Sequence, residues 1–256
     1  MMVDKETIKK NFSRCAPGYD KHASVQKMVA SQLIKLIKKR RFDNILDIGC
    51  GTGIYTKYLR ERFPKAHIKA VDISPGMIDV ACRKDELKGI EFVACDGETM
   101  DLTDSFDLIT SSASFQWFTD LETALSRYRG ALKKGGMMLF STFGPLTFYE
   151  LNQTLDDFFG KGAFTHSHTF DGRAKIENTL KTLFEDVAIE EKQYKEVYDS
   201  IKNLLMTIKL CGIRGKGISQ RSVWVPETIS GLEERYIRRF EGIVATYQAF
   251  FCRGEK

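Results

Sequence analysis

Ile45-Leu46-Asp47-Ile48-Gly49-Cys50-Gly51-Thr52-Gly53 is the stretch that decides the fold of this chain. A short apolar run ends there in three alternating glycines, and apolar residues at helical spacing follow from Ile54. This pattern predicts a strand, a tight turn and a helix N-terminus at which backbone comes close to a ligand. A dinucleotide-binding fingerprint has its third glycine where this chain has Ile54. The acid Asp47 beside the turn suits a ligand with ammonium or hydroxyl groups better than a pyrophosphate.

Short apolar segments alternate with longer amphipathic segments on both sides of this stretch. Strands are predicted at 45–48, 68–71, 90–94, 106–111, 137–142, 186–196 and 243–252. Helices are predicted at 25–37, 54–63, 120–132, 147–159, 174–183, 199–210, 226–240 and directly after the cap Ser74-Pro75. The alternation is typical of a doubly wound, mostly parallel α/β sheet, here with seven strands.

Four of the predicted strands end in residues that suit a ligand. These residues are the glycine turn, Asp72, Asp96 and Ser112. Ligands of open parallel sheets bind beyond the carboxyl ends of the strands, and an acid about 20 residues after the glycine turn accepts ribose hydroxyls. The agreement of four strand ends is stronger evidence for a ligand site than the glycine turn alone.

We interpret residues 1–256 as one domain with additions to its core. The cofactor-binding core is expected at 45–142, and two insertions at 144–170 and 198–226 are expected on the ligand side of the sheet. Residues 5–24 form a polar, helical N-terminal segment, in which Pro17-Gly18 interrupts the spacing between Phe12 and Tyr19. This segment, with residues up to 30, is either a hinged flap over the site or a packed arm.

Composition restricts the class of protein. With 256 residues, 43% hydrophobic and 29% charged, the chain has the profile of a globular protein. Because no apolar leader and no run of about 18 apolar residues is present, we expect a cytoplasmic protein without a membrane span. The six cysteines show no C-x-x-C spacing, which argues against a disulfide framework and a zinc site. His166 and His168 have no third ligand nearby, so we expect no metal there.

The net charge of +5 is concentrated in two basic runs. These are Lys35, Lys38, Lys39, Arg40 and Arg41 in the first run, and Arg235, Arg238 and Arg239 in the second. Such runs favour helix C-termini and solvation, but they also suit the steering of an acidic macromolecule.

The motif from Asp47 to Gly53, followed by Asp72 and Asp96, resembles the class I S-adenosylmethionine-dependent methyltransferases. The resemblance covers residues 45–142 and implies a Rossmann-like fold that binds S-adenosylmethionine and releases S-adenosylhomocysteine. In that family the glycine turn lies against the methionine moiety, and acids contact the amine, the ribose and the adenine. The cofactor-binding residues implied are Phe12, Tyr19, Gln26, Asp47, Gly49, Cys50, Gly51, Gly53, Asp72, Ile73, Met77, Asp96, Gly97 and Ser112.

Further motifs along nearly the whole chain resemble the malonyl-[acyl-carrier protein] O-methyltransferase family of early biotin synthesis. They are Phe12-x6-Tyr19-Asp20-x-His22-Ala23-x2-Gln26, Asp72-Ile-Ser-Pro-Gly-Met77, Gln116-Trp117, Ser141-Thr-Phe-Gly-Pro145, Glu150-Leu151, Leu204 to Gly212 and Tyr247. The chain departs from the family where Leu210-Cys-Gly-Ile213 stands in place of Ala-Thr-Gly-Ala.

This second resemblance implies methyl transfer to the free carboxylate of malonyl-acyl carrier protein or of malonyl-CoA. We expect the protein to be a monomer. The nucleophile is ionised at neutral pH, so no general base is needed. The acceptor-side candidates are Tyr19, Gln116, Trp117, Lys209, Arg214 and Arg173. We expect Tyr19 to close the site and one of the three basic residues to select the malonyl carboxylate.

Three alternatives stay open at this point. One is another carboxylate methyltransferase, for example of the trans-aconitate type, and a second is a non-catalytic S-adenosylmethionine-binding protein. The third is a nucleic-acid methyltransferase. The net positive charge permits this third alternative. The fourth strand, however, ends in Ser111-Ser-Ala-Ser114 instead of an N-P-P-Y-type tetrapeptide, so we expect no nucleic acid partner.

Overall fold

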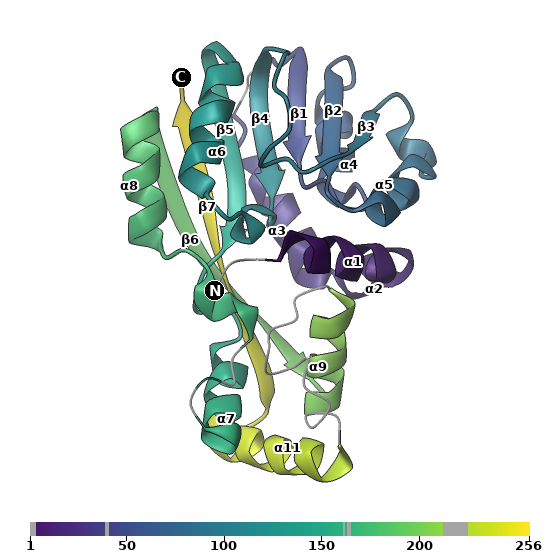
Figure 1. Ribbon diagram of the computed structural model, residues 1–256, viewed down its shortest axis with the longest axis vertical. Helices are drawn as coiled ribbons and strands as arrows, with labels where there is room; N and C mark the ends of the chain where they lie inside the picture. Colours follow the sequence, from purple (N-terminus) through teal and green to yellow (C-terminus); the bar gives the residue numbers. More distant parts are fainter. Residues whose placement is uncertain (1–3, 39–40, 161, 163–164, 212–224) are drawn as a thin grey trace. The chain divides into compact units, whose positions relative to one another are not determined.

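The fold is a seven-stranded sheet in the order β3-β2-β1-β4-β5-β7-β6 (Figure 1). The computed structural model describes residues 4–38, 41–160, 162, 165–211 and 225–256. The strands are β1 (Asn44–Ile48), β2 (His67–Asp72), β3 (Glu91–Ala94), β4 (Phe106–Ser112), β5 (Leu132–Phe143), β6 (Glu185–Tyr198) and β7 (Ile243–Glu255). The strand count and the edge position of β6 confirm the sequence prediction.

Pairing within the sheet is mostly parallel. The pairs β1–β2, β1–β4, β2–β3 and β4–β5 are all parallel. β7 runs antiparallel to β5, because Gly135 donates to the carbonyl of Lys256 while Gly144 donates to that of Gln248, both at 2.9 Å. Because β1 to β4 are parallel, their carboxyl ends lie on the same side of the sheet.

Helices cover the sheet on both faces (Figure 1). The longer ones are α1 (Lys5–Cys15), α3 (Ser24–Lys35), α4 (Ile54–Arg62), α5 (Pro75–Cys82), α6 (Leu121–Ala131), α7 (Tyr149–Phe159), α8 (Arg173–Leu183), α9 (Ile201–Leu210) and α11 (Pro226–Phe240). Leu125 and Tyr128 of α6 and Leu180 of α8 are buried in one cluster with Leu46 of β1. In the described part of the chain, no helix has the length and apolar character needed to span a bilayer.

The glycine turn has the geometry that its spacing predicts. Gly49, Gly51 and Gly53 all have positive φ, at 68°, 56° and 84°, and Gly53 is the N-cap of α4. Each of these three positions therefore needs the left-handed backbone conformation, which glycine adopts without the steric strain that other residues incur. After β2, the Ser74 hydroxyl accepts from the amide of Met77 and caps α5, as predicted.

The N-terminal segment is helical and broken at the predicted place. α1 ends at Cys15, a single 3₁₀ turn η1 (Ala16–Gly18) contains Pro17, and the short helix α2 (Tyr19–His22) follows. Because proline removes a backbone donor and disfavours the helical conformation before it, the break falls between the two aromatic residues.

β5 begins earlier than predicted. It starts at Leu132 instead of 137, and its register against β4 shifts between Phe106 and Leu108. Gly135 and Gly136 lie in this irregular part, which their small size and the positive φ of Gly135 accommodate. A glycine pair weakens a local strand prediction, but hydrogen bonds to Lys256 hold this segment in the sheet.

The chain forms two compact units. Unit 1 comprises Met1–Thr142, Arg173–Glu191 and Phe250–Lys256, and unit 2 comprises Phe143–Gly172 and Lys192–Ala249. The predicted core lies in unit 1. The predicted insertions lie mostly in unit 2, with residues 212–224 outside the described part. The single-domain description and the placement of the insertions on the ligand side stay predictions.

Candidate functional site

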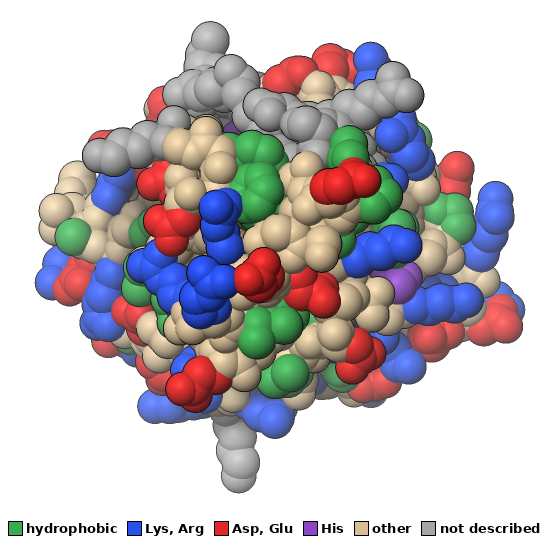
Figure 2. Space-filling model, turned by 90° about the horizontal axis from the view of Figure 1, so that it is seen from below, with side chains coloured by type: hydrophobic (Ala, Val, Ile, Leu, Met, Phe, Trp, Pro, Cys, Tyr) green, Lys and Arg blue, Asp and Glu red, His purple; other side chains and the backbone are tan. Residues whose placement is uncertain are grey.

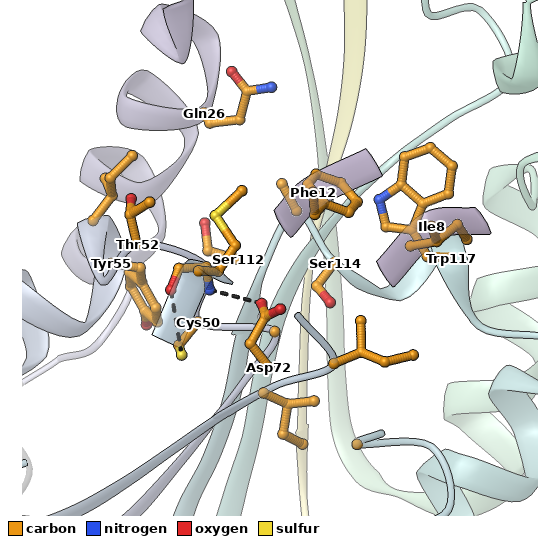
Figure 3. Close-up of a pocket in the computed structure, with 18 of the residues that line it drawn as sticks. Ile8, Phe12, Gln26, Cys50, Thr52, Tyr55, Asp72, Ser112, Ser114 and Trp117 are labelled. Atoms are coloured by element: carbon orange, nitrogen blue, oxygen red, sulfur yellow. Dashed lines mark hydrogen bonds between the residues drawn. The ribbon is translucent and has the colours of Figure 1, made fainter. Parts of the chain in front are cut away.

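A cavity lies in unit 1 at the carboxyl ends of β1 to β4 (Figure 3). It contains about 900 Å³ of space that protein atoms do not fill, counting its open mouth. Most of the residues predicted to bind a cofactor line it: Phe12, Tyr19, Gln26, Gly49, Cys50, Gly51, Asp72, Ile73, Met77, Asp96, Gly97 and Ser112. The four strand ends therefore meet at one cavity, as their positions in the sequence indicate.

Asp72 is fixed at the end of β2 by two backbone amides. Its Oδ2 accepts from the amide of Gly51 and its Oδ1 from that of Ser74, both at 2.8 Å. Figure 3 shows the first of these bonds beside the cavity. Burial raises the pKa of Asp72 to about 6 in spite of both bonds. Each carboxylate oxygen keeps a second lone pair, so the side chain can accept from two ligand hydroxyls.

The glycines of the turn have two different uses. A Cβ on Gly49 would lie 1.9 Å from Oγ of Ser114, so this glycine allows the turn to approach the end of β4. A Cβ on Gly53 would lie 2.4 Å from Cδ1 of Leu87, and Gly53 does not line the cavity. At Gly51, no atom of the described residues lies within 4 Å of the Cβ position. That open space is available to a ligand.

Asp47 does not line the cavity. Its side chain is fully buried behind the turn, where Oδ2 accepts from the hydroxyl of Thr56 at 2.6 Å. Oδ1 has no hydrogen-bond partner in the described part of the chain, and burial raises the pKa of Asp47 to about 7. The structure thus places this acid close to the turn without bringing it to the ligand space, and its direct contact with an amine stays a prediction.

Aromatic side chains from the N-terminal segment and from η3 (Phe115–Trp117), a 3₁₀ turn that follows β4, form one wall of the cavity (Figure 3). Phe12 makes edge-to-face contacts with Tyr19 and Trp117, with ring centroids 6.3 and 5.9 Å apart. Phe12 and Tyr19 therefore line the cavity at the strand ends, and the choice between a hinged flap and a packed arm stays a prediction. Gln116 lies outside the lining, and its amide donates to the carbonyl of Ala113.

Polar contacts of three residues hold the N-terminal segment in this position. The hydroxyl of Ser13 bonds that of Ser74 at 2.8 Å. Asp20 accepts from the hydroxyl of Thr52 and, at 2.7 Å, from the ammonium of Lys84. Lys5 is the third residue and contacts acids after β3. Because Thr52 belongs to the glycine turn, α2 is fixed directly to the predicted cofactor site.

The basic acceptor-side candidates do not meet in the cavity. Arg173, the first residue of α8, bonds the carbonyl of Ile189 and pairs with Glu177, and it does not line the cavity. We therefore leave it out of the proposed site. Lys209 lies on α9 in unit 2, and Arg214 lies outside the described residues.

The sequence interpretation missed several lining residues, among them Lys5, Ile8, Thr52, Tyr55 and Ser114. The spacing of Lys5, Ile8 and Phe12 at i, i+3 and i+7 puts all three on one face of α1, and this signal was present in the sequence. Ser114 follows a strand end, where its close approach to Gly49 becomes visible only in three dimensions.

The lining fits S-adenosylmethionine. At their positions in the lining, the carboxylate of Asp72 can accept from ribose hydroxyls and that of Asp96 can accept from the amino group of a base. Apolar walls from Ile73, Met77 and Phe118 suit the faces of that base. Two carboxylates against one ammonium leave the lining negative, which favours a cationic ligand. Within the described residues, no cluster of three or more His, Cys, Asp or Glu is arranged to hold a metal ion, and His166 and His168 lie in the 3₁₀ turn η4 (His166–Thr169).

Comparison with known proteins agrees with this site. Residues 46–140 match the family model described as a methyltransferase domain. A malonyl-[acyl-carrier protein] O-methyltransferase of Acetivibrio thermocellus is 35% identical, over 100% of this chain and 95% of the relative. One of Bacillus cereus is 33% identical, over 98% and 97%.

A solved structure, the YcgJ protein from Bacillus subtilis, shares the fold. It has a TM-score of 0.63 at 18% identity and covers 90% of this chain and 98% of its own. Since the sequence relatives match over almost their whole length, this chain is an S-adenosylmethionine-dependent methyltransferase and belongs to the malonyl-[acyl-carrier protein] O-methyltransferase family.

Proposed function

We propose that this enzyme methylates the free carboxylate of malonyl-acyl carrier protein and so makes the malonyl methyl ester for biotin synthesis. The observation that carries the proposal is the full-length similarity to relatives with that name, combined with a cavity that fits the methyl donor. The nearly complete coverage favours this acceptor over a free diacid of the trans-aconitate type. The fit of the acids and glycines to S-adenosylmethionine disfavours a merely regulatory protein.

The reaction needs no general base from the protein. When bound, S-adenosylmethionine supplies an electrophilic methyl group on a cationic sulfur. The malonyl carboxylate is already ionised at neutral pH, so the protein need not remove a proton. Opposite charges disappear during transfer, and a dry, low-dielectric site therefore favours the transition state over the separated ions.

The residues of the cavity supply dryness and alignment. We propose that Phe12, Tyr19 and Trp117 exclude water and present aromatic faces that suit a cationic sulfur. Tyr19 also carries the hydroxyl that we propose contacts the acceptor carboxylate or the cofactor. Alignment of the reactants alone can lower the activation barrier by about 7–11 kcal/mol in well-oriented systems. Lys209 and Arg214 remain the proposed partners that select the malonyl carboxylate.

The basic runs proposed to bind the acidic carrier differ in their surroundings. In the first run, Arg41 lies three residues before β1, at the amino end of that strand and therefore opposite to the cavity, and Lys39 and Arg40 lie outside the described residues. We leave this run out of the docking proposal. On α11, Arg238 pairs with Glu234, Arg239 pairs with Asp157, and Arg235 stacks on the ring of Phe158.

Charge on the surface is mixed. Over the described part of the face in Figure 2, basic and acidic side chains lie next to one another. We propose α11 as the carrier-docking helix, with its arginines exchanging their intramolecular partners for acids of the carrier. The turnover rate with the carrier substrate should then fall as salt rises, whereas the rate with malonyl-CoA should change little.

The reaction is tested directly by mass spectrometry. The enzyme is incubated with S-adenosylmethionine and malonyl-acyl carrier protein, and a mass increase of one methyl group on the acyl chain, removed by mild ester hydrolysis, is the expected result. Malonyl-CoA, acetyl-acyl carrier protein and trans-aconitate are run in parallel. An Asp72→Ala variant serves as the control for cofactor binding. Methylation of trans-aconitate with none on the malonyl thioesters would refute the proposed acceptor.

We also propose that the enzyme acts in the cytoplasm as a monomer. All six cysteines are free thiols, and four of them are buried, as is usual in a reducing compartment. Sedimentation of the purified protein checks the oligomeric state.

A further inference from the structure

Lys5 is the one basic side chain among the described residues that line the cavity. It begins α1, and its Nζ lies 3.0 Å from Oδ1 of Asp96 and 2.6 Å from Oε2 of Glu98. The same ammonium lies 4.8 Å from the ring centroid of Phe118. Its side chain is only 22% exposed, so these contacts are shielded from solvent more than an ordinary surface ion pair.

The two oxygens of Asp96 have different surroundings. Oδ1 accepts from Lys5 and also from the amide of Glu98, at 3.0 Å in both cases. No donor in the described part of the chain bonds Oδ2, although Asp96 lines the cavity. The side chain is therefore held by one oxygen and offers the other to a ligand as an acceptor.

Glu98 gives Lys5 a second function. This carboxylate is 8% exposed and accepts from the amides of Thr119 and Asp120, so it cannot easily move away from Asp96. Two carboxylates that share one ammonium would repel each other without it, so the removal of Lys5 would turn the carboxylate of Asp96 away from Glu98 and out of its present orientation.

We propose that Lys5 is a positioning residue for the nucleobase of the cofactor. It holds the carboxylate of Asp96 in the orientation that offers Oδ2 to the cavity as an acceptor, so that the site prefers a base with an exocyclic amino group over one with a carbonyl in that place. Because Lys5 is carried by α1, this preference exists only when α1 covers the cavity. The inference rests on the cofactor of the proposed function and not on its methyl acceptor.

Binding measurements test the inference without catalysis. Affinities for S-adenosylhomocysteine and its deaminated analogue, S-inosylhomocysteine, are measured by isothermal titration calorimetry. Lys5→Met keeps the apolar stem and removes the charge, and we expect it to weaken S-adenosylhomocysteine binding about 10- to 100-fold. The preference for the amino-bearing ligand should fall at least tenfold, and Lys5→Arg should restore most of it. Lys10→Met, on the exposed side of the same helix, is the matched control and should bind as wild type does.

A double-mutant cycle separates positioning from simple attachment of α1. If Lys5 acts through Asp96, the Lys5→Met change should have little further effect on ligand preference in an Asp96→Asn background. Additive effects, or an unchanged preference in Lys5→Met, would overturn the inference. Failure of the enzyme to methylate malonyl thioesters would leave this test intact, whereas failure of the wild type to bind S-adenosylhomocysteine would refute the cofactor assignment itself.

Discussion

Gly76, near the start of α5, allows α1 to lie close to the cavity, and its replacement by alanine tests the closed flap without altering a lining residue. A Cβ on Gly76 would lie 2.9 Å from both Cα and the carbonyl oxygen of Ser13. Ordinary contact begins at 3.4 Å, so the backbone of α1 must retreat by about 0.5 Å. Phe12 is the neighbour of Ser13, and this movement would displace the aromatic wall.

The replacement should lower both activity and stability, because the atoms that the new Cβ meets belong to the backbone of α1. Since a misplacement of 1 Å can cost about 100-fold, half of that shift predicts a loss of about tenfold in kcat/KM. α5 itself should gain up to about 1 kcal/mol from the better helix propensity of alanine. The assay is methyl transfer under steady-state conditions, with affinity for S-adenosylhomocysteine measured in parallel and unfolding followed in denaturant.

Gly130→Ala is the matched control for Gly76→Ala. Gly130 also lies in a helix, α6, and no described atom lies within 4 Å of its Cβ position. We expect Gly130→Ala, which meets no such clash, to raise stability by up to about 1 kcal/mol and to leave kcat/KM unchanged. If Gly76→Ala kept both kcat/KM and ligand affinity within twofold of wild type, the close packing of α1 on α5 would be irrelevant to function.

Substitutions at three other residues test the site and its surroundings. Asp47 has a folded pKa of about 7 against 3.8 unfolded, so the folded state loses up to about 4 kcal/mol as pH rises from 4 to 8. Asp47→Asn should gain stability relative to wild type over that range, and a difference that does not vary with pH, in denaturant titrations, would contradict the buried-acid account. Asp72 must be ionised to accept two hydroxyls, so affinity for S-adenosylhomocysteine should fall as pH drops below about 6. Asp72→Asn should bind weakly with no such pH dependence in calorimetry. Tyr19→Ala should lower kcat/KM at least tenfold, with Tyr19→Phe separating ring from hydroxyl, and wild-type kinetics in both variants would refute the role of Tyr19 in closure.

Much of the fold follows from local sequence patterns, because the deciding interactions are short-range. The turn from Gly49 to Gly53 and the cap at Ser74 involve residues within a few positions of each other. Hydrophobic spacing then locates the strands, and parallel connection rules bring their ends together. The convergence of Asp72, Asp96 and Ser112 on one cavity could therefore be predicted.

The missed features depend on contacts between residues far apart in the chain. Lys5 and Asp96 are separated by 91 positions, so no local pattern indicates their ion pair. The start of β5 depends on hydrogen bonds to Lys256, and a local interpretation stopped at the glycine pair. Asp47 lies just before the glycine turn in sequence, yet its side chain points into the core, where it accepts a hydrogen bond from Thr56.

The composition of unit 1 from separate segments has a consequence for how this enzyme is made. β5 lies between β4 and β7, and the part of β7 that belongs to unit 1 is Phe250–Lys256. During synthesis, residues up to 142 leave the ribosome with the far edge of β5 still lacking its partner. The cofactor-binding unit therefore completes its sheet only after residue 256 has been made, more than a hundred residues later, and a nascent chain arrested before then should expose an apolar, unpaired strand to chaperones.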